Sequence, residues 1–280
     1  WYFYTVSPPG EQKNFDEEEI KKSFRKFHSI LYNSLVFYLT YADRGARSVS
    51  KKPDSVLDQW ILSRLSETVV EATKSLDAYA VREAALAIEG FADDLSRWYI
   101  RRSRRRLQKP DDMNDFKAVS AMLRHALLKI SKLIAPFTPF FAEALYGSLE
   151  GEEESVHLEN WPVASKSSID KKLTDDMQVV RATANALLGK REEAKIKVRQ
   201  PLQSAVIKNL ALKGKRELLE ILKDEVNVKE IVFNAKAKEG FSLDTTVTSE
   251  LKAEGMLREL IRTVQDLRQK AGYKPQEKMI

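Results

Sequence analysis

The sequence predicts a mainly α protein, with an antiparallel helical bundle followed by a small α+β C-terminal domain. Three observations point to this fold class. Gly and Pro are sparse, at 10 and 9 of 280 residues, which favours long helices over many short strands. Up to about Glu193, apolar residues recur at spacings of three and four, whereas later segments alternate apolar and polar residues. Hydrophobic residues make up 43% of the chain and charged residues 31%, which is enough for a packed core.

The bundle is predicted from long amphipathic stretches joined by short polar turns. Asp16 is placed to cap the first stretch, and the three glutamates after it suit the positive end of a helix dipole. Pro136 and Pro139 interrupt the fourth stretch, because each removes a backbone donor, and the pattern then resumes through Leu149. Trp161, in the connector that follows, is expected to fill a groove on the bundle. The expected helices cover about Asp16–Asp43, Ser55–Leu76, Tyr79–Leu107, Asn114–Ala135 and Asp170–Glu193.

The α+β part is predicted from three segments with strand-like alternation, "IKVRQPLQSAVIKN", "VNVKEIVFN" and "FSLDTTVT". A helical stretch, Lys215–Lys223, separates the first two. A final helix is expected to begin with Ser249 as its cap and to end at Gly272.

Several classes of site are excluded by composition. The chain has no cysteine, so thiolate zinc sites and disulfides are ruled out. Its three histidines are far apart, and no glycine-rich phosphate loop or Ser–His–Asp set is found. We therefore expect no catalytic residue and no metal site, and interpret the chain as a binding module or the non-catalytic part of an enzyme. Because it starts at Trp1 within what resembles a packed element, we expect a fragment of a longer protein.

The most informative stretch is "LSRWYIRRSRRRLQKP", Leu95–Pro110. On a helix with a constant step of 100° per residue, Tyr99, Ser103 and Leu107 face inward. Arg97, Arg101 and Arg105 form a row on another face. Arg104 lies beside that row and Trp98 flanks it, while Arg102 and Arg106 lie at the opposite shoulder.

This row predicts a polyanion partner. Between Arg97 and Lys109 there are seven basic residues and no acid, and like charges at i,i+4 repel by about 0.2–0.5 kcal/mol per pair. The planar guanidinium fork suits phosphate, and an aromatic ring nearby suits an unstacked base. A solvated surface, with Trp98 in ordinary packing, is the alternative. The net charge of +6 permits nucleic-acid binding without establishing it.

Several segments, in order, resemble the isoleucyl-tRNA synthetase family of class I aminoacyl-tRNA synthetases, in its eukaryote-like or archaeal-type form. They are "WYFYTVSPPGE", "LDQWILSRL", "LSRWYIRRSRRR", "LIAPFTPFFAEALY", "SVHLENWP", "REEAKIKVRQPL" and "ELKAEGMLRELIRTVQDLRQKAGY". The resemblance covers nearly the whole chain. "APFTPF" is shared with valyl and leucyl relatives, whereas "SVHLENWP" and "REEAKIKVRQPL" together are more specific to the isoleucyl enzymes.

The resemblance implies a fold and a domain order. Residues 1–14 would be a remnant of the stem-contact region, and residues 15–160 a helical bundle of the class I synthetase anticodon-binding type. Residues 161–194 would be a connector with the fifth helix, and residues 195–280 a truncated α+β appendage. The catalytic and editing domains, with their HIGH and KMSKS signatures, would precede Trp1. No cofactor is expected in this fragment, since ATP would be used by the catalytic domain of the parent enzyme, isoleucine–tRNA ligase.

The implied partners are isoleucine-accepting tRNA and the chain's own N-terminal catalytic and editing domains, with no membrane contact, in a cytoplasmic monomer. The alternatives are the same region of a valyl- or leucyl-tRNA synthetase, and a helical protein-interaction module with a basic face. The expected tRNA-binding residues are Arg97, Trp98, Arg101, Arg102, Arg104, Arg105, Arg106, Lys109, Lys190, Arg191, Lys195, Lys197 and Arg199.

Overall fold

The computed structural model describes residues 1–8, 10–12, 15–50, 52–237, 239–273 and 277. The chain divides into two compact units, Trp1–Thr174 (the bundle unit) and Asp175–Ile280 (the α+β unit), which are described separately. The division falls inside α9 (Lys171–Glu193), so the expected boundaries at residues 160 and 194 stay predictions. The boundary expected at residue 14 and the chain end at Ile280 lie outside the described residues.

The start of the bundle unit confirms the first cap and corrects the first helix. The Asp16 carboxylate accepts hydrogen bonds from the backbone N–H groups of Glu18 and Glu19. The helix that follows is divided at Phe27, which is fully buried, has φ −119° and ψ −69°, and stacks on Trp1 with ring centroids 3.6 Å apart. The apolar spacing continues through Phe27, so the pattern could not reveal the break. The helices are α1 (Tyr2–Thr5), α2 (Glu17–Lys26) and α3 (His28–Tyr41).

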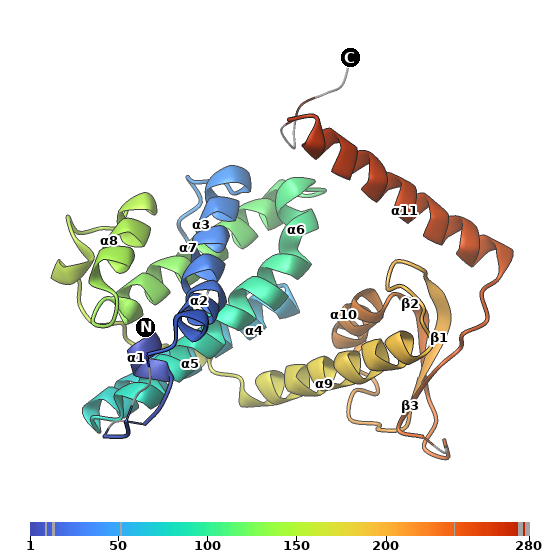
Figure 1. The fold of residues 1–280 in the computed structure, drawn as a ribbon, viewed down its shortest axis with the longest axis horizontal. Coiled ribbons are helices and arrows are strands. Elements are labelled where there is room, and N and C mark those ends of the chain that lie inside the picture. Colours follow the sequence, from blue (N-terminus) through green and yellow to red (C-terminus); the bar gives the residue numbers. More distant parts are fainter. Residues whose placement is uncertain (9, 13–14, 51, 238, 274–276, 278–280) are drawn as a thin grey trace. The chain divides into compact units, whose positions relative to one another are not determined.

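The remaining helices of the bundle unit follow the expected order (Figure 1). They are α4 (Val56–Asp77), α5 (Val81–Asp93), a π-helical segment η1 (Asp94–Ile100), α6 (Arg101–Gln108), α7 (Met113–Ile134) and α8 (Pro139–Ser148). Asp112 caps α7 through the backbone N–H groups of Asn114 and Asp115, and Pro139 occupies the first position of α8. The core between them is apolar and fully buried, including Trp60, Ile61, Ile88, Phe91, Leu123, Leu127, Ile130 and Leu145.

The connector after α8 is anchored to the bundle at Trp161. Its indole Nε1 donates to the Thr73 hydroxyl at 2.8 Å, and the ring lines a groove beside α4, as predicted. Two short 3-10 turns, η2 (Val156–Leu158) and η3 (Lys166–Ser168), lie in this connector.

The α+β unit contains, among its described residues, one three-stranded sheet in the order β2–β1–β3. β1 (Leu202–Ile207) runs parallel to β2 (Val228–Phe233), with Leu202 opposite Val228, and antiparallel to β3 (Phe241–Leu243), with Ile207 opposite Phe241. α10 (Arg216–Val226) makes the crossover that a parallel pair requires. The mainly α fold with a small α+β part is therefore confirmed.

The last helix, α11 (Ser249–Lys270), is capped by Thr248 rather than by the expected Ser249, because the Thr248 hydroxyl accepts from the Leu251 backbone N–H. Its first turns pack on the unit through buried Leu251 and Gly255. At Gly255 the Gln200 side chain approaches so closely that a Cβ would lie 2.4 Å from its Oε1. Gly272 follows the helix at φ +80°, a conformation that favours glycine.

Candidate nucleic-acid interface

The arginine-rich segment of the bundle unit presents its apolar face inward, as predicted. Tyr99 and Ser103 are fully buried and Leu107 is 3% exposed. The expected continuous α-helix is nevertheless wrong, since residues 94–100 form η1, which is wound as a π-helix between α5 and α6. A π-helix takes more residues per turn than an α-helix, so the constant 100° step fails across this segment. The projection therefore holds within α6 but does not place Arg97 relative to Arg101.

A partly buried ion-pair network links α6 to α4 and α7. The Asp58 carboxylate on α4 is 2% exposed and accepts from the Tyr99 hydroxyl at 2.7 Å. It also accepts two hydrogen bonds from the Arg106 guanidinium, at 2.8 and 2.7 Å. Asp115 on α7 accepts two more, at 2.9 and 2.6 Å. Arg106 thus joins α4, α6 and α7.

Arg106 is a correction to the expected tRNA contacts. Its side chain is 17% exposed and bound to carboxylates on two other helices. Burial alone disfavours the charged guanidinium, but the hydrogen bonds to Asp58 and Asp115 outweigh this and raise the pKa of Arg106 above its ordinary value. An arginine held in this way orients the helix and is not available to bind phosphate.

Trp98 is a second correction. The residue is only 9% exposed, because the π-helical segment turns Leu95, Trp98 and Tyr99 together into the core. The alternative of ordinary packing is therefore the one that the structure supports, and no stacking surface is available at this residue. Arg102, on the same shoulder as Arg106, is half-buried.

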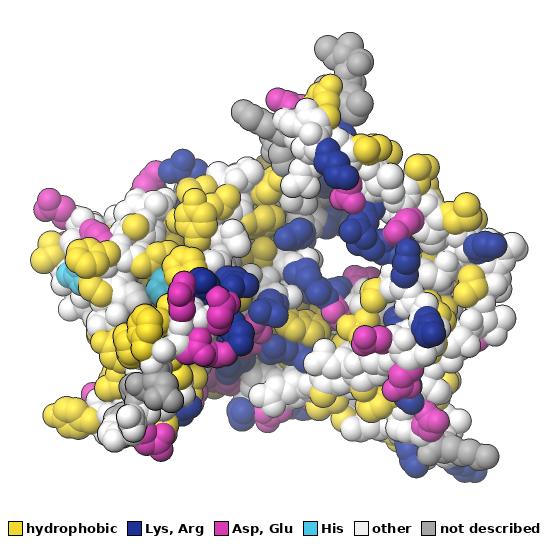
Figure 2. Space-filling model, in the orientation of Figure 1, with side chains coloured by type: hydrophobic (Ala, Val, Ile, Leu, Met, Phe, Trp, Pro, Cys, Tyr) yellow, Lys and Arg dark blue, Asp and Glu magenta, His cyan; other side chains and the backbone are white. Residues whose placement is uncertain are grey.

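The other cations of the segment lie at the surface of the bundle unit, where Figure 2 shows Lys and Arg side chains gathered over α6. The exposed members are Arg97, Arg101, Arg104, Arg105 and Lys109. Arg97 pairs with Asp93 at 2.6 Å, and Arg105 pairs with Asp111 at 2.9 Å. The Arg105 and Asp111 side chains are 78% and 79% exposed, so this pair is worth at most about 1 kcal/mol and can exchange partners.

An aromatic pair borders this arginine surface. The Arg104 guanidinium lies over the Phe37 ring of α3, 5.7 Å from its centroid, and Phe37 is tilted against Tyr41 with centroids 5.0 Å apart. Such a contact restrains the arginine, which is still exposed to solvent. We define the arginine surface as Arg97, Arg101, Arg104 and Arg105.

The second group of expected tRNA-binding residues lies in the α+β unit. It also contains one residue held within the fold and several exposed cations. Arg191 on α9 is 1% exposed and donates to four backbone carbonyls, so it is corrected from a tRNA contact to a buried structural residue. Lys190 pairs with Glu193 at 3.1 Å and Glu239 at 3.4 Å. Lys195, Lys197 and Arg199 are exposed on the turn after α9.

Sequence reasoning missed Asp58, Asp115, Phe37 and Tyr41. Asp58 offered one signal: it falls three residues before Ile61 on the apolar stripe of its helix, where a charged residue needs a buried partner. The aromatic pair on α3 offered none, because its arginine partner is distant in sequence.

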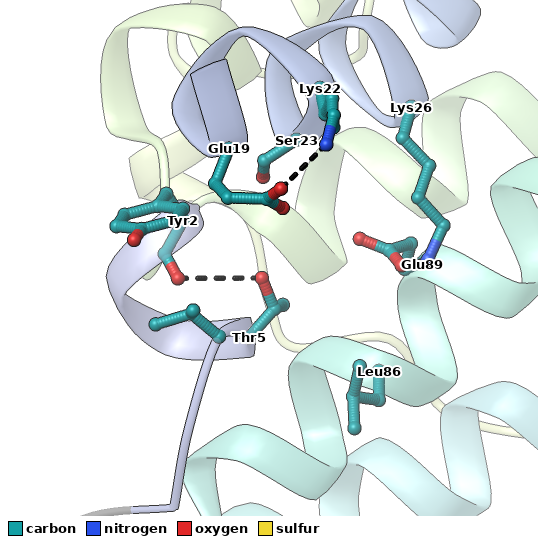
Figure 3. A pocket seen from close by; sticks show the side chains of 9 residues that line it. Tyr2, Thr5, Glu19, Lys22, Ser23, Lys26, Leu86 and Glu89 are labelled. Carbon is teal, nitrogen blue, oxygen red and sulfur yellow. Dashed lines mark hydrogen bonds and ion pairs between the residues drawn. The ribbon is translucent and has the colours of Figure 1, made fainter. Parts of the chain in front are cut away.

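A separate pocket of about 190 Å³ lies between α1, α2 and α5 (Figure 3). Its charged side chains bind one another, since Lys22 donates to Glu19 at 2.6 Å and Lys26 pairs with Glu89. Glu89 also accepts from the Trp1 indole at 2.9 Å. Among the residues that the structure describes, no cluster of His, Cys, Asp or Glu could hold a metal ion, and no helix is long and apolar enough to cross a bilayer. We interpret the pocket between α1, α2 and α5 as a surface hollow whose charged side chains pair with one another.

A known protein family matches most of the bundle unit and the start of the α+β unit. Residues 58–207, more than half of the chain, match the model of the anticodon-binding domain of tRNA ligase. The chain belongs to this family. The matched anticodon-binding domain includes α4 with Asp58, the arginine surface from Arg97 onward, α9 with Arg191 and the turn after it.

Relatives of the anticodon-binding domain are found among curated isoleucine–tRNA ligases. That of Deinococcus radiodurans is 31% identical over all of this chain, which corresponds to 34% of the relative. That of Dehalococcoides mccartyi strain 195 is 36% identical over 98% of the chain and 30% of the relative. That of Clostridium acetobutylicum is 37% identical over 84% of the chain and 23% of the relative. The chain thus spans about a third or less of these relatives.

Among solved structures, a LeuRS from Agrobacterium radiobacter K84, in a ternary complex with tRNA and LeuAMS, aligns with a TM-score of 0.44 and 16% identity. The alignment covers 60% of this chain and 19% of that one, and at this score it does not show a common fold.

Proposed function

We propose that this chain binds the anticodon stem-loop of isoleucine-accepting tRNA, as the C-terminal portion of an isoleucine–tRNA ligase. In that role it would position tRNA for aminoacylation by a preceding catalytic domain, which would bind ATP and isoleucine. The family match and the similarity to curated isoleucine–tRNA ligases support this reading. Valyl- and leucyl-type ligases stay as alternatives for the amino acid.

The proposal rests on a contrast within α6. Arg106 is bound by two carboxylates, whereas Arg101 and Arg105 are exposed to solvent. Arg106 is held from behind by Asp58 and Asp115, which fixes the orientation of α6. Arg101 and Arg105 lie on the outer side, four residues and so about 6 Å apart along the axis. A rigid helix loses little entropy when its arginines bind a phosphate backbone, and the guanidinium fork can bind each phosphate through two N–H groups.

The direct test reverses two charges of the arginine surface. With Arg101→Glu and Arg105→Glu in the 280-residue chain, we expect affinity for a tRNA transcript to fall at least about 10-fold at low salt. The slope of log affinity against log salt should become shallower by about 1.4–1.8, because each lost phosphate contact removes about 0.7–0.9. Fluorescence anisotropy over a salt series measures both quantities.

The matched control carries the same charge change on exposed lysines of the bundle unit away from α6, Lys74→Glu and Lys166→Glu. It should change affinity by less than the arginine variant. Equal affinities for the wild type and the arginine variant would remove α6 from the interface. If heparin of matched charge competes as well as tRNA, the surface is a general polyanion or protein-interaction face instead.

A further inference from the structure

The end of α9 holds a lysine where helices favour glycine. The Lys195 backbone N–H donates to the Glu192 carbonyl at 2.9 Å, and the Ile196 N–H donates to the Arg191 carbonyl at 2.9 Å. This pair of bonds is the Schellman arrangement, whose left-handed position Lys195 occupies at φ +54°. A side chain there is strained relative to glycine, so its retention has a conformational cost.

The backbone after Lys195 is tied down from the inside. Arg191 donates through Nη1 to the carbonyls of Lys197 at 3.2 Å and Gln200 at 2.9 Å. Its Nε and Nη2 donate to Val226 and Asn227, the residues that join α10 to β2, at 2.8 and 2.7 Å. One buried guanidinium therefore joins the turn to the connection between α10 and β2.

Two further side chains complete this attachment. The Asn227 side-chain amide donates to the Val198 carbonyl at 2.7 Å. The Gln200 side-chain amide donates to the Leu251 carbonyl at 2.7 Å, which ties the turn to the first residues of α11. The carbonyls of residues 197, 198 and 200 are therefore all hydrogen-bonded to side chains of this unit, which restrains the backbone of the turn.

The outer side of this turn is cationic. Lys195 is exposed, and the Lys197 and Arg199 side chains are 76% and 44% exposed. Glu259 on α11 pairs with Lys197 at 3.5 Å and with Arg199 at 3.7 Å. All three side chains are at least 41% exposed, so each pair is worth at most about 1 kcal/mol and can exchange partners. A groove of about 600 Å³, lined by α9 and by the turn, runs beside these side chains. We call Lys195, Lys197 and Arg199 the basic turn.

We propose that the basic turn binds the phosphodiester backbone of the RNA, and that Arg191 is a positioning residue that fixes the turn without touching RNA. This inference rests on the proposed function, since it takes tRNA as the ligand. Three exposed cations on a turn whose backbone is hydrogen-bonded to the rest of the unit provide the chemistry that recognises phosphate. Arg191 serves this purpose because burial leaves it inaccessible to phosphate while its N–H groups set the course of the turn.

The sharpest test is Lys195→Gly. Glycine relieves the left-handed backbone, so the melting temperature should rise by about 1–4 °C. The same change removes a phosphate contact, so affinity for a tRNA transcript should fall about 3-fold or more and the salt slope should become shallower by about 0.7–0.9. A rise in stability with a loss of affinity excludes unfolding as the cause. Unchanged affinity in a stabilised variant would overturn the role of Lys195.

Arg191 is tested by its coupling to the turn. A triple variant, Lys195→Ala, Lys197→Ala and Arg199→Ala, should lose about 10-fold in affinity. The slope of its log affinity against log salt should become shallower by about 2.1–2.7, because three phosphate contacts are lost. Arg191→Lys should lose about 3- to 10-fold in the wild-type background, but less than 2-fold in the triple variant. A merely structural role would give the same loss in both backgrounds and would contradict the positioning role.

The matched control removes three other exposed lysines of the α+β unit, through Lys208→Ala, Lys213→Ala and Lys236→Ala. Losses as large as those of the basic-turn triple would show that charge alone matters, and would overturn the site. If Arg191→Lys does not fold, Lys195→Gly and the two triples still decide. Loss of affinity in the α6 variant but not in the basic-turn triple refutes this inference alone, whereas no loss in either also refutes the proposed function.

Discussion

The arginine surface and the basic turn after α9 have the same arrangement of charges, but the groups that bind their central arginine differ. In each, exposed cations lie next to an arginine held within the fold, with the Arg106 side chain 17% exposed and Arg191 1% exposed. Arg106 is bound by two carboxylates and its pKa is raised. Arg191 is bound by backbone carbonyls, and burial lowers its pKa to about 10. The difference teaches that a buried guanidinium can anchor a surface through side-chain charge or through the backbone itself.

The two anchors also differ in what they organise. Arg106 connects three helices of one bundle, so its loss should loosen their packing and lower the free energy of unfolding. Arg191 joins the turn to the connection between α10 and β2, so its loss should mainly change the backbone conformation of the turn.

The largest expected effect is on the carboxylate anchor. Asp58→Ala leaves Arg106 with Asp115 alone and orphans the Tyr99 hydroxyl, so the free energy of unfolding should fall by about 3–5 kcal/mol. Urea unfolding measures it. Exposed Asp54→Ala is the control and should change stability by less than about 0.5 kcal/mol. A loss below about 1 kcal/mol for Asp58→Ala would show that the network does not anchor α6.

A smaller effect is expected at His125, a half-buried base whose pKa, like that of Arg191, is lowered by burial. Burial, with Lys129, Lys132 and Arg124 nearby, lowers the pKa of His125 on α7 to about 4. The unfolded chain then binds more protons than the folded one between about pH 4 and 6.5, so stability should rise with pH across that window. His125→Leu should remove up to about 3 kcal/mol of this dependence in urea unfolding at each pH. Equal pH profiles for the wild type and the variant would contradict the lowered pKa.

The smallest effect is expected at the exposed pair Arg105–Asp111. Asp111→Asn should leave stability within about 0.5 kcal/mol, because both side chains are highly exposed. It should raise tRNA affinity about 2-fold, since the carboxylate no longer competes with phosphate for Arg105. Anisotropy titrations of the two proteins at one salt concentration compare them, and weaker binding by the variant would mean that Asp111 supports the arginine surface.

A structural feature of this protein can be predicted from the sequence when the residues that cause it are neighbours in the chain. Caps and prolines act within a few residues, so Asp16 and Pro139 predicted helix ends that the structure confirms. The break at Phe27 and the π-helical segment at residues 94–100 were missed, because the apolar spacing runs through both without a local signal. The cap of α11 was misplaced by one residue, as neighbouring hydroxyls at positions 248 and 249 are equivalent in a pattern.

At the candidate interface, too, the roles of the arginines depend on residues that are distant in the chain. The arginine-rich segment was recognisable, but its members could not be ranked from sequence. Arg106 and Arg105 are adjacent and chemically identical, and they differ because Asp58 lies 48 residues away in the chain and reaches only one of them. Arg191 is distinguished from Lys190 by the carbonyls of residues 226 and 227, which only the fold brings to it.

The central claim, that exposed arginines contact tRNA while buried ones hold them in place, is tested most directly by arginine-specific labelling with phenylglyoxal followed by mass spectrometry. We predict that Arg101, Arg104 and Arg105 are labelled in the protein alone and protected when tRNA is bound, whereas Arg106 and Arg191 stay unlabelled in both states. Saturating tRNA that leaves all three exposed arginines as reactive as before would contradict the account.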